Sequence, residues 1–115
     1  MMSSVRLSLP PRISSAVRDF AARVRTRFGD RVRNLRLFGS YARGDFHIDS
    51  DVDVLIEIDG MTRRERREAY DMAEDVFEGT LVHVSPLALS TEDLQTLRAR
   101  EYRIASEIDR DGIGL

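Results

Sequence analysis

The chain has 115 residues, a formal net charge of −2, no cysteine, and 42% hydrophobic and 33% charged residues. This length fits a single domain over residues 1–115 that can bury a hydrophobic core without covalent help. The composition excludes a disulfide framework, a thiolate metal site and a cysteine nucleophile. Because all 18 basic residues are arginine, it also excludes a lysine Schiff base and a phosphate loop of the G-x-x-x-x-G-K type.

The sequence also gives expectations about the compartment. No segment approaches the ~20 apolar residues that cross a bilayer. Residues 1–12 lack the continuous apolar stretch of a signal peptide. We therefore expect a cytoplasmic protein that does not use a membrane. The nearly balanced charge gives no indication of a nucleic-acid partner.

The first half of the chain predicts a helix followed by two strands. Proline suits the first turn of a helix, and apolar residues then recur at helical spacing over residues 11–28, namely Ile13, Val17, Phe20, Val24 and Phe28. Gly29 and Asp30 end this helix. A short apolar run then predicts a strand that ends at Gly39, and residues 40–50 read as a loop with a turn of helix. Residues 51–58, β-branched and apolar in their second half, give the clearest strand.

The second half predicts a helix, a strand and a final helix. Residues 61–78 carry an apolar face of Ala69, Met72, Ala73, Val76 and Phe77, and Gly79 is expected to stop that helix. Residues 81–84 predict a third strand closed by Ser85 and Pro86. Ser90 and Asp93 resemble a capping box for a helix over residues 91–110. Its inward side chains are predicted to be Leu94, Leu97, Ile104 and Ile108.

This order of elements favours an α+β fold with a small mixed sheet flanked by helices. A dinucleotide-binding fold is not indicated, because no G-x-G-x-x-G sequence follows a strand.

The stretch from Leu37 to Val54 contains the candidate catalytic and binding residues. A predicted strand ends at Gly39 and Ser40, where glycine lets a ligand approach the backbone closely. If a helical turn begins there, its free amides attract phosphate, and the Ser40 hydroxyl adds a donor or acceptor. Arg43 offers a cation to the same phosphates. Ser40 is as well explained as a helix cap, and Arg43 as the partner of Asp45 or Asp49.

Asp51 and Asp53 begin the clearest strand. Period-two geometry puts both side chains on one face, with Cα atoms roughly 6.6 Å apart. Magnesium commonly binds through one or two carboxylates and substrate phosphates. This segment therefore combines a candidate phosphate-binding turn with a candidate magnesium-binding pair of carboxylates. The alternative is a solvated strand start. A calcium loop fits poorly, because Val54 and Gly60 stand where its glycine and glutamate belong.

The spacing from Gly39-Ser40 to Asp51-x-Asp53 resembles the signature of the DNA polymerase β-like nucleotidyltransferase superfamily, and GSYARG with SDVDV is similar to its minimal nucleotidyltransferase branch. The resemblance covers residues 32–85. It implies transfer of a nucleoside monophosphate from a triphosphate, here taken as ATP, to a hydroxyl acceptor. It also implies that Gly39 and Ser40 hold the phosphates, and that Asp51 and Asp53 are catalytic and bind Mg²⁺, with Mn²⁺ as an alternative. Many minimal members are antitoxins that pair with a helical HEPN-type partner.

One position departs from the family pattern. The family has a third carboxylate on a later strand, and here His83 is the tentative equivalent. Neutral histidine can act as a base, although it is a softer ligand than magnesium prefers. Glu57 lies about 13 Å from Asp53 along the strand, too far to share one ion. Glu78 and Asp45 stay open as alternatives, and His83 could equally pack at a sheet edge.

Two hypotheses follow for the function. The first is a magnesium-dependent nucleotidyltransferase that modifies a partner protein or another acceptor. The second is a catalytically weak, antitoxin-like binding module that neutralises a HEPN-type toxin. The acceptor and any homo-oligomer are left open by the sequence.

Overall fold

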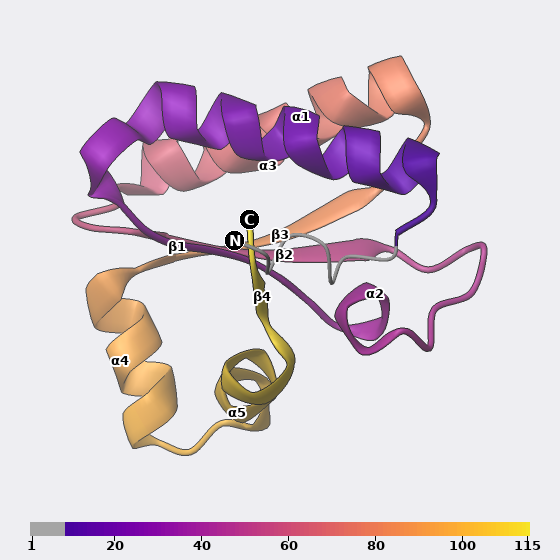
Figure 1. Ribbon diagram of the computed structural model, residues 1–115. Helices are drawn as coiled ribbons and strands as arrows, with labels where there is room; N and C mark the ends of the chain where they lie inside the picture. Colours follow the sequence, from indigo (N-terminus) through magenta and orange to yellow (C-terminus); the bar gives the residue numbers. More distant parts are fainter. Residues whose placement is uncertain (1–8) are drawn as a thin grey trace.

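A computed structural model describes residues 9–115, which form one mixed four-stranded sheet with helices on both faces (Figure 1). The strand order is β3-β2-β1-β4. β1 pairs antiparallel with β2 and β4, whereas β2 and β3 are parallel. The predicted α+β class with a small mixed sheet is therefore confirmed. The strands are β1 (Val32–Phe38), β2 (Val52–Ile58), β3 (Val84–Ser90) and β4 (Ile113–Gly114).

The helices form a layer on each side of this sheet. Figure 1 shows α1 and α3 side by side on one face, with α4 and α5 on the other. A short helix, α2, lies between β1 and β2. The helices are α1 (Pro11–Phe28), a 3₁₀ turn (Gly29–Arg31), α2 (Ser40–Arg43), α3 (Arg63–Thr80), α4 (Thr91–Ala99) and α5 (Arg103–Asp111). No helix within residues 9–115 is long and apolar enough to span a bilayer.

The first helix forms as its apolar periodicity predicts. α1 begins at Pro11 and ends at Phe28, and all five predicted inward residues are buried. They pack with the even-numbered positions of β2 and the inner face of α3 in the larger hydrophobic cluster.

The strand β2 is buried on both faces, which explains its almost continuous apolar sequence. Leu55 packs on the other side of the sheet with Phe38 of β1, Leu94 of α4 and Ile108 of α5. Because side chains alternate along a strand, Asp53 shares the face of Leu55. The beginning of this strand therefore presents the Asp53 carboxylate toward the α5 side of the sheet.

The boundaries around β3 differ from the sequence expectation. α3 continues through Gly79 to Thr80 and ends at Leu81, which adopts a left-handed conformation with φ 61°. The strand begins at Val84 rather than at residue 81, and it includes Pro86 instead of stopping before it. Proline is tolerated there because β3 is an edge strand with β2 as its one neighbour. Arg66 of α3 donates from Nε to the Ala88 carbonyl at 3.1 Å.

The predicted helix over residues 91–110 is two helices. α4 ends at Ala99, and the chain turns at Glu101, whose φ is 57°. Leu94 and Ile108 are buried as expected, but the break leaves Ile104 37% exposed. Ser90 caps α4 by accepting from the Asp93 amide at 3.0 Å. The short strand β4, which the sequence does not predict, then pairs with β1.

A charged cluster joins the start of β1 to the start of α3. The Glu65 carboxylate accepts from Arg31 at 2.6 and 2.8 Å and from the Thr62 amide at 2.9 Å, while Thr62 Oγ1 accepts from the Glu65 amide at 3.1 Å. Arg31 also donates to the Asp59 and Gly60 carbonyls. Glu65 is buried, so this cluster fixes the turn between β2 and α3.

We predict that Glu65→Gln lowers the free energy of unfolding by about 2 kcal/mol at pH 7, because it weakens charged hydrogen bonds among three segments. Glu68→Gln is the control, because it removes a more exposed paired contact with Arg27. Its effect should stay below about 1 kcal/mol. Urea denaturation measures both changes.

The same cluster predicts a pH dependence. The hydrogen bonds from Arg31 and Thr62 lower the pKa of Glu65 from 4.5 to about 2. A carboxylate with a lowered folded pKa stabilises the fold fully above its unfolded pKa, and this contribution is lost as the pH falls. The difference between native protein and Glu65→Gln should therefore shrink from pH 4.5 toward pH 2. An undiminished difference at pH 2 would contradict this assignment.

Candidate active site

The Asp53 carboxylate lies directly against Gly39. The β1–β2 register pairs Phe38 with Asp53. Gly39, which follows β1, therefore lies beside the beginning of β2. A Cβ on Gly39 would overlap the Asp53 carboxylate and would lie 3.1 Å from its Cγ. Gly39 also has φ 75° and ψ −156°, a conformation that is essentially restricted to glycine. The packing and the backbone thus require glycine at this position.

The turn after Gly39 is the single helical turn α2. The Ala42 and Arg43 amides both donate to the Gly39 carbonyl at 3.1 Å. The preceding amides, at the start of this turn, have no carbonyl behind them in the helix. The predicted cation, Arg43, donates from Nε to Asp45 at 3.2 Å. This hydrogen bond raises the pKa of Arg43, with further contributions from the charges of Asp45, Asp111 and Glu107.

Asp53 is half-buried, and its negative charge is only partly offset by a nearby cation. Burial raises the pKa of Asp53, the charge of Asp51 raises it further, and Arg43 lowers it. No ion pair involving Asp53 is found among residues 9–115. A half-buried carboxylate whose pKa is raised by burial and by a neighbouring carboxylate is an arrangement that a bound cation relieves.

Asp53 lines a pocket of about 460 Å³, which we call the Asp53 pocket. Small-molecule sites commonly fall in the range of about 300–1,000 Å³. The pocket joins the turn after β1 to the start of β3 and to α5. Its polar lining is Gly39, Ser40, Arg43, Asp53, Ser85 and Glu107. The predicted phosphate-binding residues and Asp53 therefore face one space.

Ser85 and Glu107 are pocket residues that the sequence analysis missed. Ser85 pairs with Asp53 in the parallel β2–β3 register. Glu107 comes from α5, more than fifty positions after Asp53, and no local motif marks it. It lines the pocket together with Ile104, which is three residues earlier and so on the same face of that helix.

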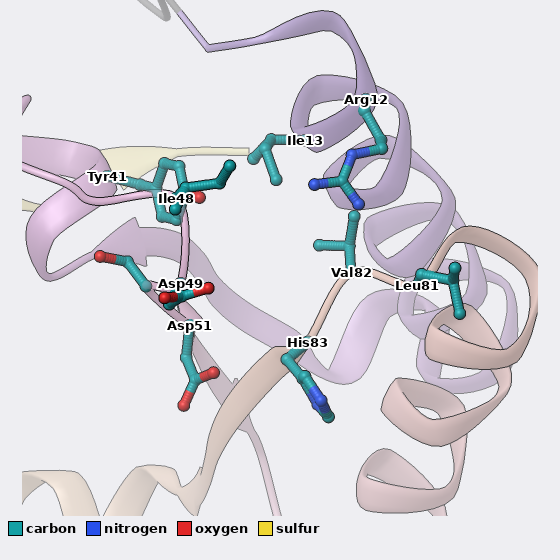
Figure 2. A pocket seen from close by; sticks show the side chains of 10 residues that line it. Arg12, Ile13, Tyr41, Ile48, Asp49, Asp51, Leu81, Val82 and His83 are labelled. Atoms are coloured by element: carbon teal, nitrogen blue, oxygen red, sulfur yellow. The ribbon is translucent and has the colours of Figure 1, made fainter.

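Asp51 lines a second, neighbouring pocket of about 270 Å³, which we call the Asp51 pocket (Figure 2). His83 lies in the same pocket, just before β3, and its carbonyl accepts from the Val52 amide at 2.9 Å. The His83 ring stacks on Phe77 of α3, with ring centroids 4.1 Å apart. The two aspartates thus line different pockets at the start of one strand.

Within residues 9–115, no three His, Asp or Glu side chains form a group that could enclose a metal ion. The predicted ligand pair, Asp51 and Asp53, stays a prediction, as do the roles of Gly39, Ser40, Arg43 and His83. Their presence in the linings of these two pockets is the geometry on which these roles depend.

Comparison with known proteins identifies the fold and then the family. A crystal structure of a toxin-antitoxin with AMP-PNP superposes with a TM-score of 0.56 at 18% identity, over 83% of this chain and 68% of that one. This similarity shows a shared fold. Residues 17–107 match the nucleotidyltransferase domain family, and the chain belongs to that family.

Two curated relatives come from Methanocaldococcus jannaschii, and each is named "Putative protein adenylyltransferase". One is 42% identical over 41 residues, and the other is 39% identical over 62 residues. The matched stretches cover 36% and 53% of this chain, and 41% and 63% of the relatives. A Sulfolobus solfataricus structure described as a "putative nucleotidyltransferase" matches at a TM-score of 0.48 and 22% identity, over 81% of this chain and 82% of that one.

We predict that Gly39→Ala abolishes binding of ATP with Mg²⁺, because the added Cβ would displace the Asp53 carboxylate. Gly60→Ala is the matched control. Gly60 also has a positive φ, 66°, but a Cβ there meets nothing within 4 Å. Both variants should lose some stability, and isothermal titration should show nucleotide binding by Gly60→Ala alone. Equal binding by the two variants would contradict the importance of this contact.

We also predict that Asp53→Asn raises the free energy of unfolding at pH 7 in the absence of divalent cations. A raised pKa means that the folded protein disfavours the ionised carboxylate relative to the unfolded chain. The gain should disappear below pH 3.8, the ordinary pKa of this group, where the native carboxylate is protonated in both states. Thermal melts at pH 7 and pH 3 measure it. A variant that melts lower than the native protein at pH 7 would disprove this reasoning.

Proposed function

We propose that this protein is a magnesium-dependent nucleotidyltransferase, which moves AMP from ATP to a hydroxyl of a partner protein or another acceptor. The observation that carries the proposal is the packing of Asp53 against the Gly39–Ser40 turn, with Asp51 two residues before it. The names of the curated relatives support AMP as the group and a protein as the acceptor. A cytoplasmic location would supply ATP and magnesium together.

The residues present suit a hard divalent cation. Oxygen ligands are those that magnesium prefers, and Mn²⁺ takes the same set. Asp51 and Asp53 would hold the ion, since Asp53 is half-buried, carries a raised pKa and lacks a cationic partner among the described ion pairs. When bound, the ion supplies neutralisation of the charge that develops on the phosphates.

The Asp53 pocket suits the triphosphate. The backbone amides at Gly39 and Ser40 would donate to phosphate oxygens, and the Ser40 hydroxyl would add another hydrogen bond. Arg43 would exchange its contact with Asp45 for a phosphate oxygen, since Asp45 is 64% exposed at its side chain and that ion pair is weak. These contacts would orient the α-phosphorus toward Asp51, where the acceptor would approach.

Transfer requires the acceptor hydroxyl to lose its proton. The hydroxyl oxygen forms a bond to the α-phosphorus, the bond from that phosphorus to the bridging oxygen breaks, and pyrophosphate leaves. His83 would take the proton on a ring nitrogen, because it lines the same pocket as Asp51. Histidine is a competent base near neutral pH. It would fill the role that the third aspartate has in the family pattern.

The second candidate function is an antitoxin-like module that binds a helical HEPN-type toxin with little catalysis. The observation that favours it is His83 at the position expected for an aspartate. A structure of similar fold is described as a toxin-antitoxin with AMP-PNP, which supports a protein partner under either function.

The test uses ATP labelled at the α-phosphate, Mg²⁺, and the product of the neighbouring reading frame as the acceptor. We expect label on that protein, and Asp53→Asn should reduce the rate at least ~100-fold. His83→Ala should lower the rate of transfer while leaving ATP affinity unchanged. A tight complex that carries no label and tolerates Asp53→Asn would favour the binding module. Failure of the native protein to bind ATP with Mg²⁺ would discard the enzyme.

A further inference from the structure

Three rings and one carboxylate line a small pocket between α3 and β3, which we call the aromatic pocket. Its volume is about 210 Å³. The rings belong to Tyr70 and Phe77 of α3 and to His83, just before β3, and the carboxylate belongs to Glu74. Neither aspartate of the candidate active site lines this space. The remaining lining residues are Ala73, Val84 and Pro86.

The helix α3 places its contribution to this pocket on one face. Tyr70, Glu74 and Phe77 are separated by four and three positions, the spacing of side chains that neighbour each other on a helix. Phe77 packs against the His83 ring, with ring centroids 4.1 Å apart and planes inclined by 22°. Tyr70 is 43% exposed. One pair of rings is therefore already packed, whereas the Tyr70 ring is available to a ligand.

The charge at the aromatic pocket is negative. Among the described residues, Glu74 is the only fixed charge in the lining, and it is exposed. No ion pair within residues 9–115 involves Glu74. Glu78 follows one turn later, and the last turn of α3 has no basic residue. Because carboxylates are unfavourable near the C-terminal end of a helix, a cation brought here by a ligand would offset this charge.

Aromatic faces combined with a carboxylate are the groups that recognise an organic cation. The negative face of a ring attracts a positive charge. A guanidinium is planar, so it stacks on a ring and also donates two hydrogen bonds to one carboxylate. An anion or an apolar group would leave Glu74 without a partner. The volume of about 210 Å³ lies below the range of about 300–1,000 Å³ of small-molecule sites, and it suits a single side chain.

We propose that the aromatic pocket is a docking site for an arginine side chain of a partner polypeptide. The guanidinium stacks on the Tyr70 ring and pairs with the Glu74 carboxylate, and the methylene stem packs against Phe77. No arginine within residues 9–115 lines the pocket. The inference goes beyond the proposed function, since none of the residues assigned to ATP or to magnesium lines this pocket.

Two blocked tripeptides test the docking site. One is acetyl-Ser-Arg-Ser-amide, and the other has citrulline, an uncharged group of the same shape, in place of arginine. Titration of each peptide at millimolar concentrations is followed by NMR of the labelled protein. The arginine peptide should shift the amide signals of residues 70–77 and 83–85. It should bind at least about fivefold more tightly than the citrulline peptide, because the cation–π contact and the ion pair both require the charge.

The carboxylate is tested by Glu74→Gln, which should weaken binding of the arginine peptide about threefold and reduce its advantage over the citrulline peptide. Asp71→Asn is the matched control. It removes an exposed carboxylate about one turn earlier on the same helix, and Asp71 does not line the pocket. At physiological ionic strength, where charges farther from the ligand are screened, Asp71→Asn should keep the native preference.

The aromatic contact has its own pair of variants. Tyr70→Leu keeps an apolar side chain but removes the ring face, so it should weaken binding of the arginine peptide about threefold. Tyr70→Phe keeps the ring and should bind the peptide as the native protein does. Because Tyr70 is partly exposed, both variants should melt near the native temperature, which separates a lost contact from lost folding.

Three results would overturn the docking site, whether or not ATP binds. The first is equal binding of the two peptides by the native protein, or equal binding of the arginine peptide by Tyr70→Leu and Tyr70→Phe. The second is tighter binding of free arginine than of the blocked peptide, which would assign the pocket to a small molecule. The third is self-association that Glu74→Gln abolishes, which would assign it to a second copy of this chain. Selective binding of the arginine peptide without ATP binding would support the docking site and overturn the enzyme.

Discussion

The contact between the Asp53 carboxylate and Gly39 governs the arrangement of the candidate site. It exists because the antiparallel register sets Phe38 opposite Asp53, so that the turn after β1 closes onto the first residues of β2. A side chain at Gly39 would separate the two. This one approach brings together the amides of the turn, a carboxylate and, through the parallel register with β3, Ser85. A sheet of different strand order would scatter the same residues.

The elements with the strongest periodicity were predictable from the sequence. α1 follows from the spacing of apolar residues, and β2 from its β-branched run, because each signal reflects burial of a whole face. Around β3 the prediction was wrong. Pro86 reads as a strand terminator in isolation, yet it is accommodated at an edge. Glu101 carries no signal for the left-handed turn that divides α4 from α5. These features depend on tertiary context.

The residues of the candidate site were likewise predictable only in part. Gly39, Ser40, Arg43 and Asp53 lie within fifteen positions, so local spacing suffices to place them at one pocket. Glu107 reaches that pocket because α5 packs against the sheet and the following strand, β4, pairs with β1. A short stretch of sequence does not reveal this long-range arrangement. Asp51 was expected to share a space with Asp53, whereas it lines the neighbouring pocket with His83. In the proposed reaction, that separation would give the nucleotide and the acceptor distinct approaches to the two carboxylates.

The outer side of β3 limits how this molecule can associate. Pro86 offers no amide hydrogen, and the Ala88 carbonyl is already occupied by the Arg66 guanidinium. An incoming strand would therefore find an interrupted row of hydrogen-bonding groups, which discourages both domain-swapped sheets and fibril growth from this border. What this flank offers instead is a pocket lined by side chains of α3, among them Tyr70 and Phe77.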